Sequence, residues 1–364
     1  SLSITIPIIM VLVYLGFINI AVESEVKVVE NLGVTDVEQA QQTTPFLILK
    51  SVSETEKVFY DTQHTVVEEY GQLSVSGRYM VDKEGSPVQL RGMSLFWSQW
   101  MGKFYTQETV RWLKTNWNVT IVRASMAVED VDGYLNNKAR EKAKIFEVID
   151  AAIEEGIYVL VDWHSHHAED YIAEAKDFFS EVAEKYGDTP NIIYETYNEP
   201  LDVSWSAVLK PYHEEIIAEI RKYDPDNIVV CGTRNWSQRV DEVVNNELSD
   251  KNVMYTLHYY ATSHKENVRR LTETALANNI PIFVTEYGVT DYSGDGEIDV
   301  ASANTWWNFL DENKISWCNW SIADKAESSA ALKPGASGKG KWSENEITES
   351  GLMVRAEMKA KNSY

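Results

Sequence analysis

Two glutamates, Glu199 and Glu286, stand where apolar segments of the chain end, and they could act together as a pair of carboxylates. Glu199 closes the segment that starts at Asn191 and precedes Pro200, and Glu286 closes the segment that starts at Pro281. Glutamate is unfavourable in a strand and is rarely buried without a partner. Cleavage of a glycosidic bond requires two carboxyl groups, one to protonate the leaving oxygen and one to attack or to activate water. The pattern favours this chemistry over two solvated strand ends.

Eight apolar segments after residue 70 have the continuous Val, Ile, Leu and Tyr content that is typical of strands covered on both faces. They are expected at residues 88–94, 120–126, 158–164, 192–199, 228–232, 253–260, 282–286 and 317–321. Amphipathic helices are expected between them at 138–155 and 168–186, and a last helix is expected at 349–361. Pro211 is expected in the first turn of another helix, where proline is tolerated.

This alternation over residues 71–364 predicts a (β/α)8 TIM barrel with a parallel eight-stranded core. An open doubly wound sheet is the alternative, but no G-x-G-x-x-G motif follows the first strand. In a barrel the carboxyl ends of the strands share one rim, so the polar and aromatic residues at these ends would converge. These residues are Arg123, His164, Asn198, Glu199, Trp236, His258, Tyr260, Glu286 and Trp320.

The residue types at this rim suit the work that two carboxylates would need. Arg123 is a fixed positive donor that can hold Glu286 ionised, and Tyr260 can donate a hydrogen bond to the same carboxylate. Asn198 can bind a sugar 2-hydroxyl, a contact that strengthens in the transition state. Glu199 must carry a proton at the working pH, so we expect its surroundings, including the charge of Glu286, to raise its pKa.

The composition of the 364 residues narrows the class of protein. A net charge of −23 argues against nucleic acid, whose phosphates require Lys and Arg, and it fits a neutral ligand. The 12 Trp and 19 Tyr residues exceed what a core needs and suit a protein that stacks flat rings. Cys231 and Cys318 lie in separate apolar segments and are expected to be free buried thiols. Because no C-x-x-C or H-E-x-x-H spacing occurs, we infer no metal and no cofactor.

The first 70 residues differ in character from the rest of the chain. Residues 4–22 are almost wholly apolar, which indicates a secretory signal peptide over residues 1–22 or, alternatively, a membrane anchor. Residues 23–70 are acidic and lack a helical or strand period, so we predict a disordered linker or propeptide. We therefore expect a secreted, extracellular protein whose catalytic barrel occupies residues 71–364, with anchoring through residues 4–22 as the alternative.

Seven segments, in order along the chain, carry a resemblance to a known family. They are GMSLFWSQW, IVRASM, VDWHSH, NIIYETYNEPL, YTLHYYATSH, FVTEYG and NWSIADKAESSAAL. From about Gly71 to its end the chain resembles the glycoside hydrolase family 5 endoglucanases, which are retaining cellulases of clan A. It is most similar to the branch found in bacteria and plant-feeding invertebrates. The chain departs from the family at three positions. Phe96 and Ala127 stand where some members carry histidine and tyrosine, respectively, and Tyr287 stands where tryptophan is usual.

The resemblance implies endo-acting hydrolysis of β-1,4-glucosidic bonds in cellulose and related β-glucans, with Glu286 as nucleophile and Glu199 as general acid/base. The residues that it implies around the substrate are Arg123, His164, Asn198, His258, Tyr260, Trp320 as a stacking floor, Lys325 on the glycone side, and the more distant Trp100, Trp236 and His264. A retaining mechanism predicts carboxyl groups about 5–5.5 Å apart, against about 6.5–9.5 Å in an inverting enzyme. We expect a monomer with a polysaccharide substrate and no obligate protein partner.

Two other interpretations stay open. A related hydrolase that acts on mannan, xylan or mixed-linkage glucan would carry the same two glutamates. A non-catalytic carbohydrate-binding barrel would keep the tryptophans but lose one carboxylate, and both carboxylates are present here.

His166 and His167 are interpreted as part of a solvated loop and not as ligands. Glycosylation sequons occur at Asn118, Asn235 and Asn319, and we expect them to be unmodified in an active enzyme.

Overall fold

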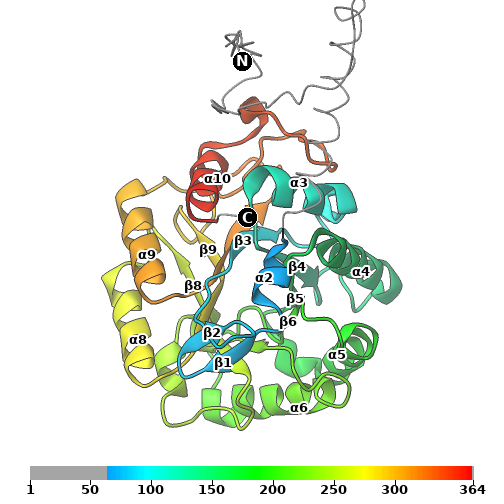
Figure 1. The fold of residues 1–364 in the computed structure, drawn as a ribbon, viewed down its shortest axis with the longest axis vertical. Coiled ribbons are helices and arrows are strands. Elements are labelled where there is room, and N and C mark those ends of the chain that lie inside the picture. Colours follow the sequence, from blue (N-terminus) through cyan, green and yellow to red (C-terminus); the bar gives the residue numbers. More distant parts are fainter. Residues whose placement is uncertain (1–63, 363–364) are drawn as a thin grey trace, which may run out of the picture. The chain divides into compact units, whose positions relative to one another are not determined.

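Eight parallel strands close into a barrel in the computed structural model, which describes residues 64–362 (Figure 1). The barrel strands are β3 (Arg91–Leu95), β4 (Ile121–Ala127), β5 (Tyr158–His164), β6 (Ile192–Glu195), β7 (Val229–Cys231), β8 (Val253–Tyr260), β9 (Ile282–Gly288) and β10 (Trp317–Ile322). Each strand pairs with the next along the chain, and β10 closes the ring on β3 with Trp317 opposite Arg91. The predicted TIM barrel is confirmed, and the open doubly wound sheet is wrong.

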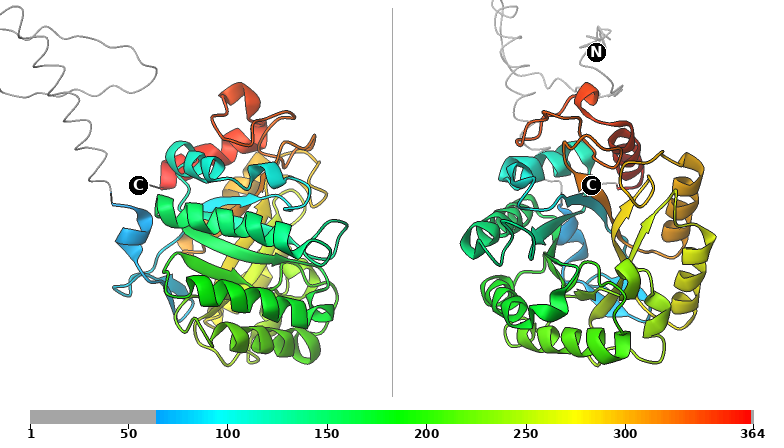
Figure 2. Two further views of the ribbon diagram at one scale, coloured as in Figure 1. Left: turned by 90° about the vertical axis from the view of Figure 1, so that its right-hand side faces the viewer. Right: turned by 180° about the vertical axis from the view of Figure 1, so that it is seen from behind.

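Helices surround the barrel as an outer ring, which Figure 1 and the right-hand view of Figure 2 show from opposite ends. The α-helices are α2 (Val66–Tyr70), α3 (Gln107–Trp117), α4 (Lys138–Glu155), α5 (Ile172–Tyr186), α6 (Lys210–Ile220), α7 (Arg234–Ser237), α8 (Glu266–Ala277), α9 (Val300–Glu312) and α10 (Glu349–Lys361). Shorter helical turns are η1 (Gly102–Phe104), η2 (Ala168–Asp170), η3 (Trp205–Leu209), η4 (Val240–Val243) and η5 (Glu344–Glu346). Pro211 lies in the first turn of α6, as predicted.

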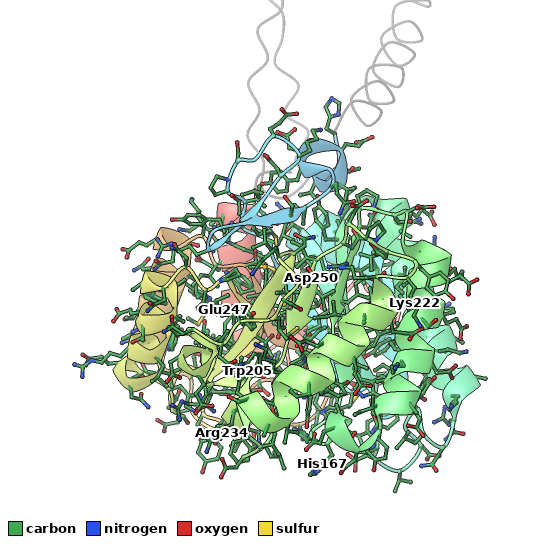
Figure 3. The ribbon with its side chains drawn as sticks, turned by 90° about the horizontal axis from the view of Figure 1, so that it is seen from below. His167, Trp205, Lys222, Arg234, Glu247 and Asp250 are labelled. Atoms are coloured by element: carbon green, nitrogen blue, oxygen red, sulfur yellow. The ribbon has the colours of Figure 1, made fainter. Side chains whose placement is uncertain are left out.

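A short helix and a hairpin cover the amino-terminal end of the barrel. The hairpin pairs β1 (Ser74–Ser76) with β2 (Tyr79–Val81), and α2 precedes it. Thr65 and Glu68 form a capping box at the start of α2, and the Val67 N–H donates to the Gly156 carbonyl at the end of α4. Figure 3 shows this end at the edge opposite His167 and Arg234, which belong to the rim loops.

Residues 66–70 are therefore helical and belong to the folded unit, although the sequence placed them in a disordered linker. Their α2 helix forms because it has both a capping box and a docking surface on α4. The predicted signal peptide over residues 1–22 and the linker up to residue 63 lie outside the described residues and stay predictions. Within residues 64–362, none of the helices has the length and apolar character that spanning a bilayer requires.

The core lies inside the barrel and between the barrel and its helices. Every residue of β4 and of β5 is buried, in agreement with strands covered on both faces. Seven of the 12 tryptophans belong to this main core, so the abundance of tryptophan is mostly a packing feature and only partly a ligand feature. Cys231 and Cys318 are buried free thiols, as predicted.

The carboxyl ends of two strands differ from the prediction by two residues or more, and both bear on the site. β6 ends at Glu195 instead of residue 199, because its neighbour β7 is short and ends at Cys231. After a last bond from the Thr196 N–H to the Val230 carbonyl of β7, the chain continues along β5. There the Asn198 and Glu199 N–H groups donate to the Trp163 and Ser165 carbonyls. β9, in contrast, runs past Glu286 to Gly288, so Glu286 lies within a strand and Glu199 in a loop.

Candidate active site

Most of the predicted site residues meet at the carboxyl-terminal rim of the barrel. Each comes from a strand or from the loop that follows it, as expected for this fold. They are Arg123 on β4, His164 at the end of β5, Asn198 and Glu199 after β6, His258 and Tyr260 on β8, Glu286 on β9 and Trp320 on β10. All of these side chains are buried except Glu199 and Tyr260, which are partly exposed.

Arg123 is the fully buried centre of this site. Its guanidinium contacts Glu286 at 3.0 Å, Glu195 at 2.7 Å and Asp162 at 2.9 Å, and it donates to Asn198 Oδ1 at 2.7 Å. Burial lowers the pKa of Arg123, but the charges of the three carboxylates outweigh burial and raise this pKa well above its usual value. One permanent cation therefore holds Glu286 and Asn198 in fixed positions, and its charge acts against protonation of Glu286.

Both oxygens of Glu286 are held by donors. Tyr260 O–H donates to Oε1 at 2.7 Å, and Arg123 donates to Oε2 at 3.0 Å. Burial and the charge of Glu199 raise the pKa of Glu286, whereas His258, Arg123 and the Tyr260 hydrogen bond act in the opposite direction. The carboxylate is consequently oriented before any substrate arrives, which is what a nucleophile needs.

Glu199 contacts two histidines, one at each oxygen. Its Oε1 lies 2.8 Å from Nδ1 of His258, and its Oε2 lies 3.1 Å from Nε2 of His166. Although burial opposes the charged form, the hydrogen bonds from His166 and His258 lower the pKa of Glu199 to about 2. Our prediction of a raised pKa is therefore wrong for Glu199 without substrate, because two imidazole donors outweigh burial and the charge of Glu286.

The hydrogen bonds behind His258 show how a proton can still reach Glu199. The Thr285 hydroxyl donates to Glu195 Oε1 at 2.6 Å, so it must accept from Nε2 of His258 at 2.8 Å. Nε2 therefore carries a hydrogen. The remaining proton lies between Nδ1 and Glu199, as imidazolium with carboxylate or as neutral imidazole with carboxylic acid. His258 and Glu199 therefore share the proton that we had expected on Glu199 alone.

The state of this pair follows from its surroundings. Burial disfavours the charged imidazole, but the charge of Glu286, the nearby Glu195 carboxylate and the hydrogen bond to Glu199 raise the pKa of His258 to about 9. The pair therefore keeps its proton through neutral pH. Transfer from Nδ1 to Oε1 across a 2.8 Å contact needs no movement of either side chain.

The distance between Glu199 and Glu286 decides which reaction they could perform. One oxygen of each carboxylate and one ring nitrogen of His258 all lie within 4.8 Å of one another. This short spacing fits the retaining arrangement and leaves less room than an inverting enzyme needs for water. The spacing alone would admit a cation, but the His258 nitrogen already shares a hydrogen bond with Glu199.

A pocket of about 450 Å³ opens beside the two carboxylates. It is lined by Glu199, Asn235, Trp236, Gln238, His258, Tyr260, His264, Glu286 and Tyr292. Three consecutive residues, 235–237, have positive φ angles of 60°, 54° and 56°, a strained turn that leaves the Trp236 side chain 45% exposed. The Trp236 N–H donates to the Pro200 carbonyl at 2.8 Å, which ties this wall to the segment that follows Glu199.

A second aromatic group lies outside this pocket, on elements β3 and β10. Trp320 packs against Phe96 at 5.1 Å between ring centroids and stacks on His164 at 5.2 Å with parallel planes. Trp100 is 55% exposed and packs with Phe96, and the Lys325 ammonium lies 5.7 Å from the Phe96 ring. Phe96 thus places a second aromatic ring beside Trp320, inclined to it by 39°.

Comparison with known proteins decides which family this site belongs to. The family model described as Cellulase (glycosyl hydrolase family 5) matches residues 81–326. The chain belongs to glycosyl hydrolase family 5. The predicted family is therefore confirmed.

Several relatives in family 5 are similar to most of this chain. Endoglucanase A of Evansella cellulosilytica is 44% identical over 280 residues, which cover 76% of this chain and 57% of the relative. Endoglucanase Z of Dickeya dadantii is 44% identical over 287 residues, covering 78% of this chain and 65% of the relative. The chain thus spans about three fifths of the length of these two relatives.

Solved structures of family 5 members agree with the fold. A Cytophaga hutchinsonii structure has 53% sequence identity and a TM-score of 0.81, covering 82% of this chain and 98% of that one. The catalytic domain of a Thermobifida fusca endoglucanase has 36% identity and a TM-score of 0.78, covering 81% of this chain and all of that one.

Several residues of this candidate site escaped the sequence analysis, including His166 and Tyr292. His166, which we had interpreted as solvated, bonds to Glu199, and Tyr292 lines the pocket with 76% of its surface exposed. His166 follows the end of β5 by two residues, so its place beside the rim was a usable signal. Tyr292 lies in a loop after β9, and no pattern in the sequence fixes where that loop turns.

Proposed function

We propose that the protein hydrolyses internal β-1,4-glucosidic bonds of cellulose and related β-glucans with retention of configuration. Three observations support this. The chain belongs to family 5, its relatives carry endoglucanase names, and the carboxylates of Glu199 and Glu286 approach within 4.8 Å. The carboxylate spacing carries the mechanistic part of the proposal, since it leaves a sugar in reach of both groups and matches a double displacement.

In the first step Glu286 attacks the anomeric carbon and the glycosidic bond breaks. Arg123 and Tyr260 hold the attacking carboxylate in place, and the bond from carbon to the leaving oxygen gives its electron pair to that oxygen. Glu199 donates a proton to the leaving oxygen, and His258 can supply that proton to Glu199 through their hydrogen bond. The products are a glycosyl-enzyme ester on Glu286 and a shortened chain with a new hydroxyl.

In the second step water replaces Glu286 on the same carbon. Glu199, now a carboxylate, takes a proton from the water as the water oxygen attacks, and Glu286 leaves as a carboxylate. The proton returns to the pair of Glu199 and His258, so the enzyme regains its starting state. Two inversions at one carbon give overall retention.

The remaining residues are proposed to bind the sugar chain. Asn198, oriented by Arg123, is placed to bind the 2-hydroxyl, and Trp320 offers a flat floor backed by His164. Lys325, Trp100, Trp236 and His264 are proposed as outer contacts, and Tyr292 is added to them. A related structure of a variant Thermobifida fusca catalytic domain was obtained with cellotetraose, which supports a polysaccharide substrate for this chain. Secretion and a monomeric state stay predictions.

A substrate panel tests this function. The full chain is incubated with carboxymethyl-cellulose, mannan, xylan and mixed-linkage glucan, and both viscosity and new reducing ends are followed. We expect carboxymethyl-cellulose to lose viscosity early, because internal cleavage shortens long chains quickly. Cleavage of mannan or xylan alone would keep the mechanism and replace the substrate. Binding without cleavage of any glycan would favour the non-catalytic barrel.

A further inference from the structure

His166 contacts Glu199 on the side opposite His258, and no family role had pointed to it. Its Nε2 lies 3.1 Å from Glu199 Oε2, whereas His258 occupies Oε1. Glu199 therefore has an imidazole at each oxygen. The two imidazoles differ in exposure, because the His258 side chain is buried and the His166 side chain is 30% exposed.

The position of His166 is fixed by its backbone and by neighbouring aromatic rings. Its N–H donates to Glu129 Oε1 at 2.7 Å in the loop after β4, and its carbonyl accepts from the Tyr197 hydroxyl at 2.9 Å. Its ring packs against Trp97, 5.7 Å away between centroids. A loop that contacted only solvent would not need contacts with three other segments. The fold therefore fixes the position of the His166 ring beside Glu199.

We propose that His166 is a positioning residue for Glu199, which orients the carboxyl group from its solvent side and places a titratable charge next to it. The inference rests on the proposed function, because it assigns a purpose to a group that acts through Glu199. His166 contacts the Glu199 carboxyl group and is assigned no contact with the sugar. It acts by holding Oε2 while Oε1 exchanges its proton with His258.

The charges around His166 favour its protonated form. Glu199 faces its ring, Glu129 holds its backbone, and Glu286 lies farther off. The neighbouring histidines are His164, whose pKa burial lowers well below its usual range, and, beyond Glu199, His258. Burial lowers the pKa of His166, but the hydrogen bond and charge of Glu199, followed by Glu129 and Glu286, raise it overall. In return, His166 in its charged form stabilises the Glu199 carboxylate.

The first test is the pH profile of kcat/KM for an aryl cellobioside, using the full chain. Glutamine at 166 keeps a donor but removes the titratable charge, and alanine removes both. We expect H166Q to move the alkaline limb to higher pH by about 0.5–1 unit, because losing a nearby cation makes the acid proton harder to remove. We expect H166A to move the alkaline limb by the same amount as H166Q. The kcat of H166A should be about 3- to 10-fold lower than that of H166Q.

His167 provides a matched control in the same loop. Its side chain is exposed, and Figure 3 shows it at the edge of the molecule. The variant H167Q should keep the wild-type profile. A profile of H166Q that superimposes on the wild type, with unchanged kcat in H166A, would overturn the proposal.

A second test does not depend on activity, so it separates failure of this inference from failure of the proposed function. The pKa of the His166 ring is measured by NMR in the full chain, with H166Q to assign its signal, and again in E199Q. We expect the pKa of His166 to fall by at least about 0.5 unit in E199Q, because the neighbouring charge is gone. An unchanged value would contradict the inference even if the enzyme is active. A fall in a chain that cleaves no glycan would uphold the coupling and reject the function.

Discussion

Nδ1 of His258 lies 2.8 Å from Oε1 of Glu199, and this hydrogen bond joins a buried imidazole to the carboxyl group proposed as the acid. The bond continues through Nε2 to Thr285 and from Thr285 to Glu195. A proton on His258 is therefore stabilised by carboxylates on both sides. This relationship links the pH dependence of stability to the pH dependence of catalysis.

The stability of the protein should depend on the protonation of His258. Its pKa is raised to about 9, above an unfolded value of about 6.5, so its contribution is complete below about pH 6.5 and disappears as the pH rises through 9. We expect the free energy of unfolding to fall over this range by an amount on the order of 2–3 kcal/mol. Urea unfolding at pH 6.5 and at a pH above 9 measures it.

The variant H258Q isolates this effect from other titrations. It lacks the imidazole, so its free energy of unfolding should fall less between the two pH values than that of the wild type. H167Q, which changes an exposed histidine, should behave as the wild type. An equal fall in H258Q would show that folding does not raise the pKa of His258.

The substitutions E286Q and E199Q should lower activity in different ways. E286Q removes the nucleophile, so it should lose activity on every substrate. E199Q removes the acid, so it should lose about 10²- to 10⁴-fold on glucan but much less in the first step with a dinitrophenyl cellobioside, whose leaving group needs no proton. Pre-steady-state release of dinitrophenolate measures the first step. Equal losses of the two variants on both substrates would contradict the assignment of roles.

Arg123 should be required for stability as well as for orientation. Its removal in R123M leaves Asp162, Glu195 and Glu286 close together and buried, which costs about 3–5 kcal/mol of unfolding free energy. Arg270, whose pair with Glu266 is exposed, is the matched control, and R270M should cost less than about 1 kcal/mol. Urea unfolding compares them, and similar costs would mean that the buried network contributes little.

Tyr292 and Trp236 should affect binding on the side of the leaving sugar. Both line the pocket, and Trp236 is tied to the segment after Glu199. We expect Y292A and W236A to raise KM for soluble glucan about 2- to 13-fold, the equivalent of about 0.5–1.5 kcal/mol of aromatic contact. Cellobiosyl fluoride, which carries no leaving sugar, should be unaffected.

An exposed tyrosine elsewhere controls for surface effects. Tyr223 lies beyond the end of α6, so Y223A should keep the wild-type KM for both substrates. If Y292A matched Y223A, the pocket wall at Tyr292 would be a surface without a role in binding. If Y292A weakened cellobiosyl fluoride equally, its effect would be on the fold of the site.

The sequence predicted the elements whose patterns are strong and local. The strands at 158–164 and 253–260 match β5 and β8 to the residue, because continuous apolar content marks strands that are covered on both faces. The helix at 138–155 matches α4, since Gly156 with φ of 65° ends it in a left-handed cap. The converging rim also followed from the barrel, so most site residues could be named in advance.

The features that the sequence missed depend on contacts between distant segments. β6 ends early because β7 is short, and α2 exists because α4 gives it a surface. The lowered pKa of Glu199 results from His166, in the loop after β5, and His258, on β8, and sequence spacing shows neither contact. The prediction for His166 was wrong for the same reason. Two adjacent histidines in a loop indicate solvent exposure, and the contacts that fix this loop come from distant segments.

Trapping the glycosyl-enzyme tests the central claim most directly. A 2-deoxy-2-fluoro-β-cellobioside with a dinitrophenolate leaving group is incubated with the full chain, and the modified peptide is identified by mass spectrometry. Fluorine slows both steps, while the activated leaving group lets the first proceed, so the ester accumulates. We predict one fluorocellobiosyl group on Glu286 and its slow release when an acceptor sugar is added. An adduct on Glu199 or another residue, or turnover without any adduct, would contradict a retaining mechanism with Glu286 as nucleophile.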